Sequence, residues 1–567
     1  MRNLFYFISI SFIFVALSCA EKTDADMIII NGKVYTVNES QPWAEAIAIK
    51  EGMILKVGTT SDIQEFKGEN TETIDAKGEF VMPGFIEGHG HYSSLGRSLQ
   101  NLNFINSKNW NEIVAMVKEK IDNSEPGEWI VGRGWHQEKW NEQPHNHTHG
   151  YPNHYELSAI SPDNPVLLTH ASGHGVFAND HLMKMAGVST ETPNPVGGEV
   201  VRDAQGRAIG VFEERAMRLV RDTYSEYLKS LDADQKYDEW LEGIRLAEKE
   251  CLSKGITSFQ DAGASFKEVA DYTALAENND MKVRLWAMLR HSSKAMKGKA
   301  HTARVVDAGN GYFTCRAIKS ELDGALGAFG AWLLEPYDDK PDFVGQNTTT
   351  VEEVKAIAEI ALESDMQLCV HAIGDKANRE TLNVMEETFK NVENNDLRWR
   401  IEHSQHIDPQ DIPRFSELGV IASMQGIHCT SDAPFVVKRL GEKRAKEGAY
   451  PWRSLIDAGA LVTNGTDVPV ENADALPSFY ASVTRKRIDN GMEFFTEQSM
   501  TREEAVYSYT MANAIAAFEE NVKGSLEIGK YADLVVLSEN LIECSDEDIL
   551  KAKVLYTIVD GEVRYEG

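Results

Sequence analysis

Cysteine is scarce in this chain, and its spacing fits neither a disulfide framework nor a thiolate metal site. The 567 residues include six cysteines, at positions 19, 251, 315, 369, 429 and 544. They are far apart, form no Cys-x-x-Cys pair and mostly lie inside apolar runs. This pattern predicts buried free thiols.

Basic residues are too few to balance the acidic ones. The chain has 57 Lys and Arg against 88 Asp and Glu, which gives a formal net charge of −31. Nucleic acid and anionic membrane surfaces repel an acidic protein, so the charge argues against both as partners. We expect this acidity to serve solubility.

The apolar N-terminal run is too short to cross a membrane. Residues 4–17 are almost wholly apolar, follow Arg2 and precede Ser18 and Cys19. This predicts a signal peptide over 1–19, followed by a polar linker at 20–26. The small residue before Cys19 resembles the end of a bacterial lipobox. We therefore expect lipidation of Cys19 and an exported protein anchored to the membrane only there, with ordinary secretion as the alternative.

Hydrophobic residues make up 42 % of the chain, enough for a large core. Short apolar runs punctuated by glycine predict a small β-sandwich built from both ends, 27–79 and 521–567. Between them, at 80–520, strand-like runs alternate with amphipathic helical ones such as 502–518, which predicts a (β/α)₈ TIM barrel of the α/β class. A large insertion, 92–255, is expected to lie over the barrel mouth and shape the pocket. The eight candidate strands are 80–91, 256–263, 282–289, 316–323, 367–374, 399–405, 420–426 and 461–467.

Histidines and an aspartate stand at the ends of several candidate strands. His89 and His91 are one residue apart, so their side chains point the same way and can share a metal ion. His371, His403 and Asp467 end later strands, and these ends meet at one face of a barrel. Each has an ordinary structural interpretation alone, but together they predict a metal site.

Several motifs carry a resemblance that spans nearly the whole mature chain. The sequence resembles the metal-dependent amidohydrolase superfamily, and within it the amidohydrolase-3 group, which includes N-substituted formamide deformylases. The motifs are Pro83–His91, Lys319–Gly327, Val370–Asp375, Ile401–His403, Asn464–Val470 and Gly529–Leu534.

The resemblance implies a barrel with a β-sandwich and a centre of one or two divalent metal ions. His89 and His91 would bind the first ion, His371 and His403 the second. Asp467 would contact the first ion and also handle protons as the catalytic residue. Zn suits these ligands best, and Fe, Mn and Co also fit.

Lys319 lies where members of the family with two metals carry a carboxylated lysine that bridges the ions. A carbamate offers two anionic oxygens, whereas an ammonium repels a cation; a plain structural lysine is the alternative. Glu321, on the same strand face, departs from the apolar residue more usual there. It would bridge or crowd the metals, contact substrate, or turn towards a neighbouring cation.

These features predict a metal-dependent hydrolase that cleaves a non-peptide, amide-type C–N bond of a small molecule. Metal-activated hydroxide would attack the carbonyl, and Asp467 would pass a proton to the departing nitrogen. One alternative keeps the centre but changes the bond, to an ester, a lactone or a dipeptide. The other is a non-catalytic solute-binding lipoprotein, which the presence of all six metal-directed residues disfavours.

Four further residues are candidate substrate contacts. His174 would hydrogen-bond the substrate carbonyl, unless it is an ordinary loop residue. Trp135 would wall the pocket or pack inside the insertion. Glu213 would reach the site or form a surface salt bridge. Gln425, at the end of the seventh candidate strand, would face the barrel mouth.

Overall fold

The computed structural model describes residues 23–137, 140–170, 175–195, 198–327, 329–390, 392 and 396–567. The predicted signal peptide, Cys19 and His174 lie outside these residues. Within the described ranges, no helix has both the length and the apolar character needed to span a bilayer. The five cysteines in these ranges are free thiols, and four of them are buried.

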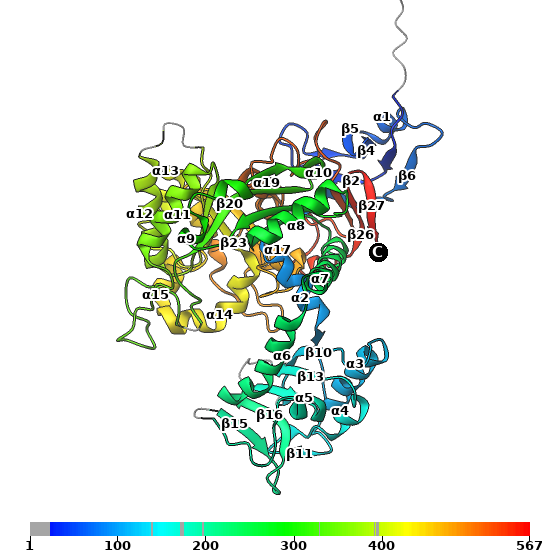
Figure 1. Cartoon of the computed structure of the whole chain (residues 1–567). Helices are drawn as coiled ribbons and strands as arrows, with labels where there is room; N and C mark the ends of the chain where they lie inside the picture. The colour runs from blue at the N-terminus through cyan, green and yellow to red at the C-terminus, as the bar shows by residue number, and fades with distance from the viewer. Residues whose placement is uncertain are drawn as a thin grey trace, which may run out of the picture.

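Eight parallel strands form a nearly closed barrel, which confirms the predicted TIM-barrel fold (Figure 1). Their order in space follows their order in the chain. Each strand is almost wholly buried, as expected of a parallel sheet covered by helices. The strands are β8 (Phe85–Gly90), β17 (Ile256–Ala264), β18 (Arg284–Leu289), β20 (Phe313–Glu321), β21 (Gln367–Ala372), β22 (Arg400–His403), β23 (Ile421–Gln425) and β24 (Val462–Gly465), with β19 (Val305–Asp307) paired to β20.

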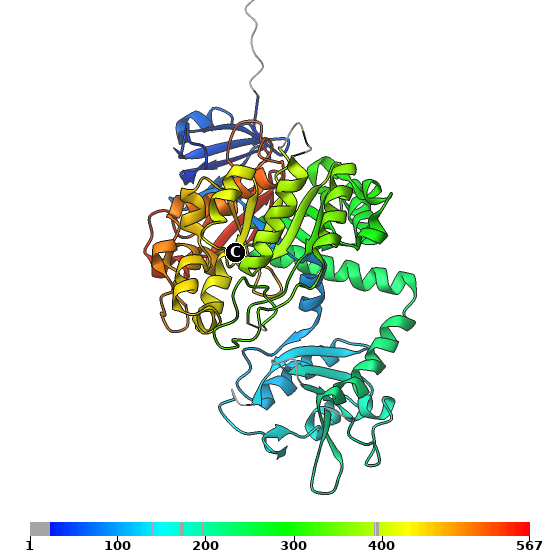
Figure 2. The ribbon, with the colours of Figure 1, turned by 90° about the vertical axis from the view of Figure 1, so that its left-hand side faces the viewer.

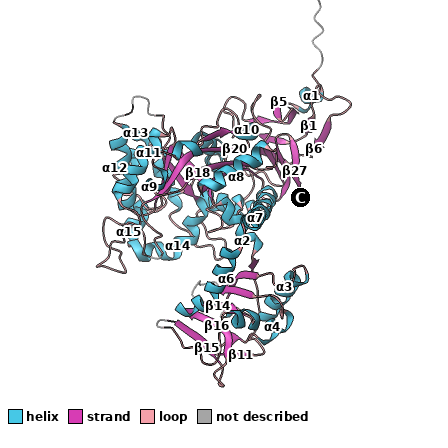
Figure 3. Ribbon diagram, viewed as in Figure 1, coloured by secondary structure: helices cyan, strands magenta, loops and turns pink. Residues whose placement is uncertain are grey.

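Helices surround this barrel, as Figure 3 shows in cyan around the magenta strands. The helical segments are α2 (Tyr92–Gln100), α7 (Ala233–Ser253), α8 (Phe266–Glu277), α9 (Ser293–Met296), η3 (Ala300–Ala303), α10 (Ala308–Gly311), α11 (Val351–Glu363), α12 (Asp375–Phe389), α13 (Ile412–Leu418), α14 (Gly426–Leu440), α15 (Glu442–Gly448), α16 (Trp452–Asp457), α17 (Ala475–Thr484), η4 (Thr496–Gln498), α18 (Arg502–Tyr509) and α19 (Met511–Ala516).

Side chains bridge the seam between the first and last barrel strands. The amide nitrogen of Asn513 donates to the carbonyl oxygens of Ile86 on β8 and Asn464 on β24, at 2.7 and 2.9 Å. The two backbones come so close that a Cβ at Gly88 would lie 2.3 Å from the carbonyl oxygen of Asn464. Glycine is therefore required just before the first histidine of the site.

Both chain ends build a β-sandwich beside the barrel, where the blue and red strands of Figure 1 meet. β7 pairs antiparallel with β25, with Met82 opposite Val535. The predicted strand 80–91 is thus two strands: β7 belongs to the sandwich, and β8 begins the barrel after Gly84. The elements of this region are β1 (Met27–Ile30), β2 (Lys33–Tyr35), β3 (Trp43–Ala44), β4 (Ala46–Lys50), β5 (Met53–Gly58), α1 (Thr60–Gln64), β6 (Glu72–Asp75), β7 (Phe80–Pro83), β25 (Leu534–Leu537), α20 (Asp546–Ile549), β26 (Val554–Val559) and β27 (Glu562–Glu566).

The insertion is a subdomain with apolar clusters of its own. Figure 2 shows it joined to the barrel by α2 in blue and by α6 and α7 in green. α2 and α7 touch so closely that a Cβ at Gly96 would lie 2.3 Å from the carbonyl oxygen of Gly243. The elements are β9 (Leu102–Asn103), α3 (Trp110–Asp122), β10 (Ile130–Trp135), β11 (His147–Thr148), β12 (Tyr151–Pro152), α4 (Tyr155–Ile160), β13 (Val166–His170), β14 (Gly175–Ala178), α5 (Asp180–Met185), β15 (Gly198–Arg202), β16 (Ala208–Glu214), η2 (Arg215–Met217) and α6 (Arg218–Ser230).

Candidate metal centre

The carboxyl ends of the barrel strands surround a cavity of about 370 Å³. Residues from five strand ends meet there, as the TIM-barrel architecture requires of an active site. The sixth predicted ligand, His89, is fully buried beside the cavity. The predicted ligands that line the cavity are His91, Lys319, His371, His403 and Asp467.

Three of the predicted ligands converge across the barrel seam. Oδ1 of Asp467 lies 3.2 Å from Nε2 of His91 and 3.7 Å from Nε2 of His89. The backbone nitrogen of Asp467 donates to the carbonyl oxygen of His89 at 2.7 Å, which ties the two strand ends together. Asp467 also has a φ of 59°, a costly backbone conformation that is found at functional sites.

A buried carboxylate orients His89. Nδ1 of His89 contacts Glu402, whose carboxylate also pairs with the buried Arg400, 2.8 Å from its Nε. Burial raises the pKa of Glu402, but Arg400 and His89 outweigh it and hold this pKa well below its ordinary range. A carboxylate on Nδ1 places the proton there and leaves the Nε2 lone pair facing the cavity, the usual support of a metal-binding histidine.

His371 and His403 form the other half of the site, with their ring centroids 4.4 Å apart. Nδ1 of His403 bonds to Oε1 of Gln425 at 2.8 Å, which leaves its Nε2 free to bind a metal. Burial holds the pKa of both histidines well below the ordinary value. Burial and the nearby Lys319 lower the pKa of His89 to about 4. All three rings are thus neutral at pH 7, the form that binds a metal.

Lys319 and Glu321 lie close in sequence but have different surroundings. Lys319 is buried, with Nζ 3.4 Å from Nε2 of His89, and burial lowers its pKa. Glu321 forms an ion pair with Arg290, and both side chains are nearly half exposed. Of the three expectations for Glu321, the structure thus shows the turn towards a neighbouring cation, and the carboxylate remains part of the cavity lining.

The chemistry of this donor set fits a divalent cation. Within the described part of the chain, two of its buried atoms, Oδ1 of Asp467 and Nε2 of His371, have no hydrogen-bond partner. Buried lone pairs without a donor cost free energy, and a bound cation removes that cost. The groups whose ligand atoms lie within 4.8 Å of one another are His89, His91 and Asp467, and His403, His428 and Asp467.

Residues 72–565 match the model of an amidohydrolase family. This protein is an amidohydrolase. The amidohydrolase is 32 % identical over 553 residues to Protein LONG AFTER FAR-RED 3 of Arabidopsis thaliana, covering 95 % of this chain and 92 % of that protein. It is 27 % identical over 555 residues to N-substituted formamide deformylase of Arthrobacter pascens, covering 95 % and 98 %.

Solved structures agree with this assignment. The crystal structure of an uncharacterized metal-dependent hydrolase from Pyrococcus furiosus superimposes with a TM-score of 0.71 at 28 % identity, covering 91 % of this chain and all of that one. With its family and these neighbours, the amidohydrolase is a metal-dependent hydrolase that uses a divalent ion.

Sequence reasoning missed His428, which lies in the first turn of α14 and lines the cavity. Its Nε2 is 3.3 Å from Oδ2 of Asp467, and its Nδ1 is 3.6 Å from Oε1 of Glu471. Burial disfavours the charged ring, but the two carboxylates outweigh it and raise the pKa of His428 to about 10. A ring protonated on both nitrogens cannot coordinate a metal, so we interpret His428 as a donor to Asp467. The sequence did offer one indication of this role: His428 follows the end of β23 by three residues, and residues just after barrel strands face the active site.

The predicted substrate contacts lie elsewhere. Gln425 is buried and orients His403; it is absent from the cavity lining. Trp135 is fully buried in the insertion, where its Nε1 donates to the carbonyl oxygen of Leu168 at 3.0 Å. Glu213 accepts from the hydroxyl of Tyr151. Within the described ranges, no residue of the insertion lines the cavity, because α2, α6 and α7 hold it away from the barrel (Figure 2).

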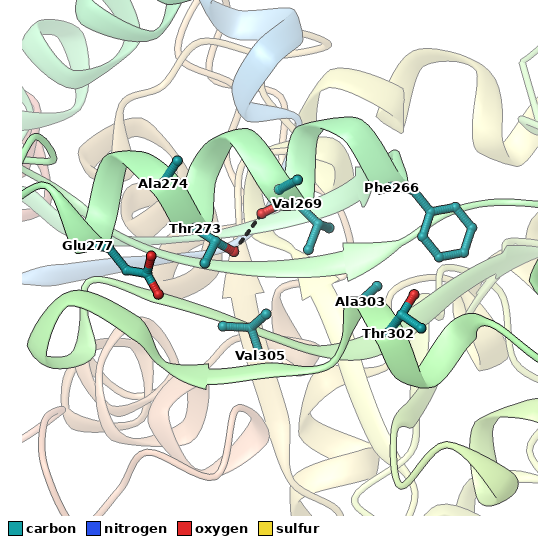
Figure 4. A pocket seen from close by; sticks show the side chains of 9 residues that line it. Phe266, Val269, Thr273, Ala274, Glu277, Thr302, Ala303 and Val305 are labelled. Carbon is teal, nitrogen blue, oxygen red and sulfur yellow. Dashed lines mark hydrogen bonds between the residues drawn. The ribbon is translucent and has the colours of Figure 1, made fainter.

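A second hollow, of about 460 Å³, lies outside the barrel between α8 and the segment 302–305 (Figure 4). Figure 4 shows Val269, Ala303 and Val305 among its lining side chains, with Glu277 as the acidic one. This lining has neither a histidine nor a paired set of metal ligands. The smaller cavity at the barrel mouth is therefore the active-site candidate, because the predicted metal ligands line it.

Proposed function

We propose that this amidohydrolase cleaves an amide-type C–N bond, other than a peptide bond, in a small molecule. The position of Asp467 carries the proposal. One carboxylate oxygen faces His89 and His91, and the other faces His428, at the wall of a cavity large enough for a small substrate. The deformylase relative, which by its name acts on N-substituted formamides, supports an amide-type bond.

A bound divalent ion supplies Lewis acidity, which lowers the pKa of a coordinated water from about 15.7 towards 7. Asp467 accepts the proton of the attacking water and then donates it to the departing nitrogen. His428 donates to Oδ2 of Asp467 and fixes the carboxylate in the orientation that this transfer needs. Burial raises the pKa of Asp467, but the nearby His428 and His91 outweigh burial and hold this pKa well below its ordinary value, so the residue begins as a carboxylate.

We propose zinc as the ion, with Fe, Mn and Co as alternatives, because neutral imidazole and carboxylate ligands suit it. We also propose that Lys319 is carboxylated and bridges two ions. Its burial and lowered pKa support this, since a neutral amine is the form that adds carbon dioxide. Elemental analysis separates the cases: two ions per chain support a bridging Lys319, and one ion contradicts it.

The experiment that tests the function joins elemental analysis to a panel of N-formyl, N-acyl and cyclic amides. We expect turnover of at least one amide class by the metal-loaded protein and none after chelation. A metal-loaded protein inactive on the whole panel would overturn the amide proposal in favour of esters, lactones or dipeptides. A protein purified without chelator that holds no stoichiometric metal would support a binding protein instead.

The structure disfavours a dipeptide among these alternatives. A free carboxylate needs an unpaired cation, and Arg290 in the cavity already pairs with Glu321. Lys319 is buried among the predicted ligands and faces His89. An uncharged acyl group fits this charge distribution better.

We further propose that the protein is exported and anchored through a lipid on Cys19, outside the cytoplasm. The support is the N-terminal sequence alone. Fractionation of cells that express the wild type and Cys19→Ala tests it. We expect the variant to leave the membrane fraction, whereas an unchanged distribution contradicts the anchor.

A further inference from the structure

One face of α14 forms a wall of the cavity. His428, Asp432 and Phe435 line it at the spacing i, i+4 and i+7, which places three side chains on one side of a helix. With a rise of 1.5 Å per residue, Asp432 lies about 6 Å along the axis from His428, and Phe435 about 10 Å. The wall thus offers an imidazole beside Asp467, then a carboxylate, then an aromatic ring.

The start of α14 is fixed relative to the strand that precedes Asp467. The backbone nitrogen of Gly426 donates to Oδ1 of Asn464 on β24 at 2.8 Å. Pro434 lies inside the helix and cannot donate to the carbonyl oxygen of Thr430. The guanidinium of Arg487 donates to that oxygen instead, at 2.9 Å. The helix therefore keeps its position in spite of the proline.

Asp432 is a carboxylate whose neighbouring cation is the protonated His428, one turn earlier on α14, which opposes the effect of burial on its pKa. Oδ2 accepts from the hydroxyl of Tyr450 at 2.6 Å, whereas Oδ1 has no hydrogen-bond partner in the part of the chain that the structure describes. Nor does any described Lys or Arg form an ion pair with it. Its neighbour His428 already faces two other carboxylates, Asp467 and Glu471. Burial raises the pKa of Asp432, so a cation beside it would be stabilising.

The charged side chains beside Asp432 already have partners, so its carboxylate is available to a substrate. Arg290 is paired with Glu321, and Glu471 faces His428. Leu326, Phe435 and Val470 supply apolar surface to the same cavity. A substrate whose carbonyl reacts beside Asp467 therefore meets a negative charge one helical turn away.

We propose that Asp432 determines specificity by binding an ammonium or a strong N–H donor of the substrate, one helical turn, or about 6 Å along α14, beyond the His428 that contacts Asp467. The substrate class is then an amide that carries a second, cationic nitrogen three bonds beyond the first carbon of its amine part, such as an N-acyl derivative of a short diamine. This inference rests on the proposed function for its reaction, but the binding that it predicts is measurable without turnover.

The test compares N-formyl-1,3-diaminopropane with N-formylbutylamine, which has a methyl group in place of the ammonium. For the metal-loaded wild type we expect kcat/KM to be about 10- to 100-fold higher for the cationic amide, which equals about 1.4–2.7 kcal/mol and is typical of a charged hydrogen bond. In Asp432→Asn, which keeps an acceptor for Tyr450, the preference falls to near one while the neutral amide retains its rate.

Two controls keep the outcomes separate. Glu447→Gln removes the same charge from an exposed position on α15 and must leave the preference unchanged. Calorimetric Kd values of both amides for Asp467→Asn, and for this variant combined with Asp432→Asn, measure recognition without hydrolysis.

If neither amide is hydrolysed but the cationic one still binds more tightly through Asp432, the proposed reaction fails and the recognition role stands. Equal binding of the two amides, or an equal loss of both in Asp432→Asn, overturns the recognition role.

Discussion

Replacing Glu402 with glutamine is expected to weaken metal binding and the folded barrel by separate routes. The carboxylate contacts Nδ1 of His89 and pairs with Arg400, and all three side chains are fully buried. Glutamine keeps the shape of the side chain but removes its charge. His89 then loses the partner that fixes its proton, and Arg400 loses its counter-charge.

The expected loss of metal affinity and the expected loss of folding stability differ in size. Loss of such a partner of a metal-binding histidine typically lowers metal affinity about 10- to 100-fold, or about 1.4–2.7 kcal/mol. A buried charge left without its partner costs about 3–5 kcal/mol. Unfolding entropy is about 2.1 cal/mol/K per residue, so a barrel on the order of 300 residues gives about 0.6 kcal/mol/K and a fall in Tm of about 5–8 °C. Hydrogen bonds from Arg400 to Gly88 and Ser423 place the expected value at the lower end.

A double variant separates the two effects. In Arg400→Met with Glu402→Gln, neither charge remains, so we expect the metal-free Tm to recover while the metal affinity stays low. Calorimetry of the metal-free proteins gives Tm, and titration against a competing chelator gives the affinity. Wild-type affinity in Glu402→Gln would refute the role assigned to Glu402, and a double variant no more stable than the single one would refute the charge argument.

Three further outcomes follow from the site. Asp467→Asn should keep its metal but lose about 10²- to 10⁴-fold in kcat; near-normal turnover of the metal-loaded variant contradicts its role in proton transfer. His428→Gln should lower kcat at unchanged metal content, whereas a parallel loss of metal would make His428 a ligand. The fully buried His406 has a pKa lowered by burial to about 3, against about 6.5 in the unfolded chain. The unfolded state therefore binds a proton that the folded state does not, and stability of the metal-free protein is lost as pH falls from about 6.5 to 3. Urea unfolding of His406→Phe should show a weaker dependence over this range, and an unchanged one contradicts the assignment.

The periodicity of the sequence was sufficient to predict the barrel. Parallel strands are continuous apolar runs, and each of the eight candidate strands overlaps an observed one. Two boundaries differ. The first candidate strand turns from one sheet into another at Gly84, and the candidate helix 502–518 is broken at Thr510, where φ is −130° and ψ is −92°. An apolar pattern predicts that a segment is buried. It does not predict whether the segment forms one strand or helix, or is divided between two.

The site residues that stand at the ends of strands could be predicted from the sequence. The residues whose position depends on how helices pack could not. The fold itself brings strand-end residues such as His371 and Asp467 together. His428 lies on a helix, and only the anchoring of α14 to β24 places it beside Asp467. Trp135 and Glu213 depend on where the insertion lies, which two close-packed helices decide. The predicted ligand roles and the lipid anchor remain predictions.

The pairing of β7 with β25 has a consequence for how the protein is made. β8, which leads to His89 and His91, continues directly from β7, and β7 finds its antiparallel neighbour at positions 534–537, more than 450 residues later. A ribosome that adds about 5–20 residues per second needs roughly 20–90 s to cover that interval. During this time the predicted ligands His89 and His91 are already synthesised, but β25, which pairs with the preceding strand β7, is not. Completion of the centre therefore waits for the last segment of the chain, and a protein truncated in its final 40 residues should emerge without a competent metal site.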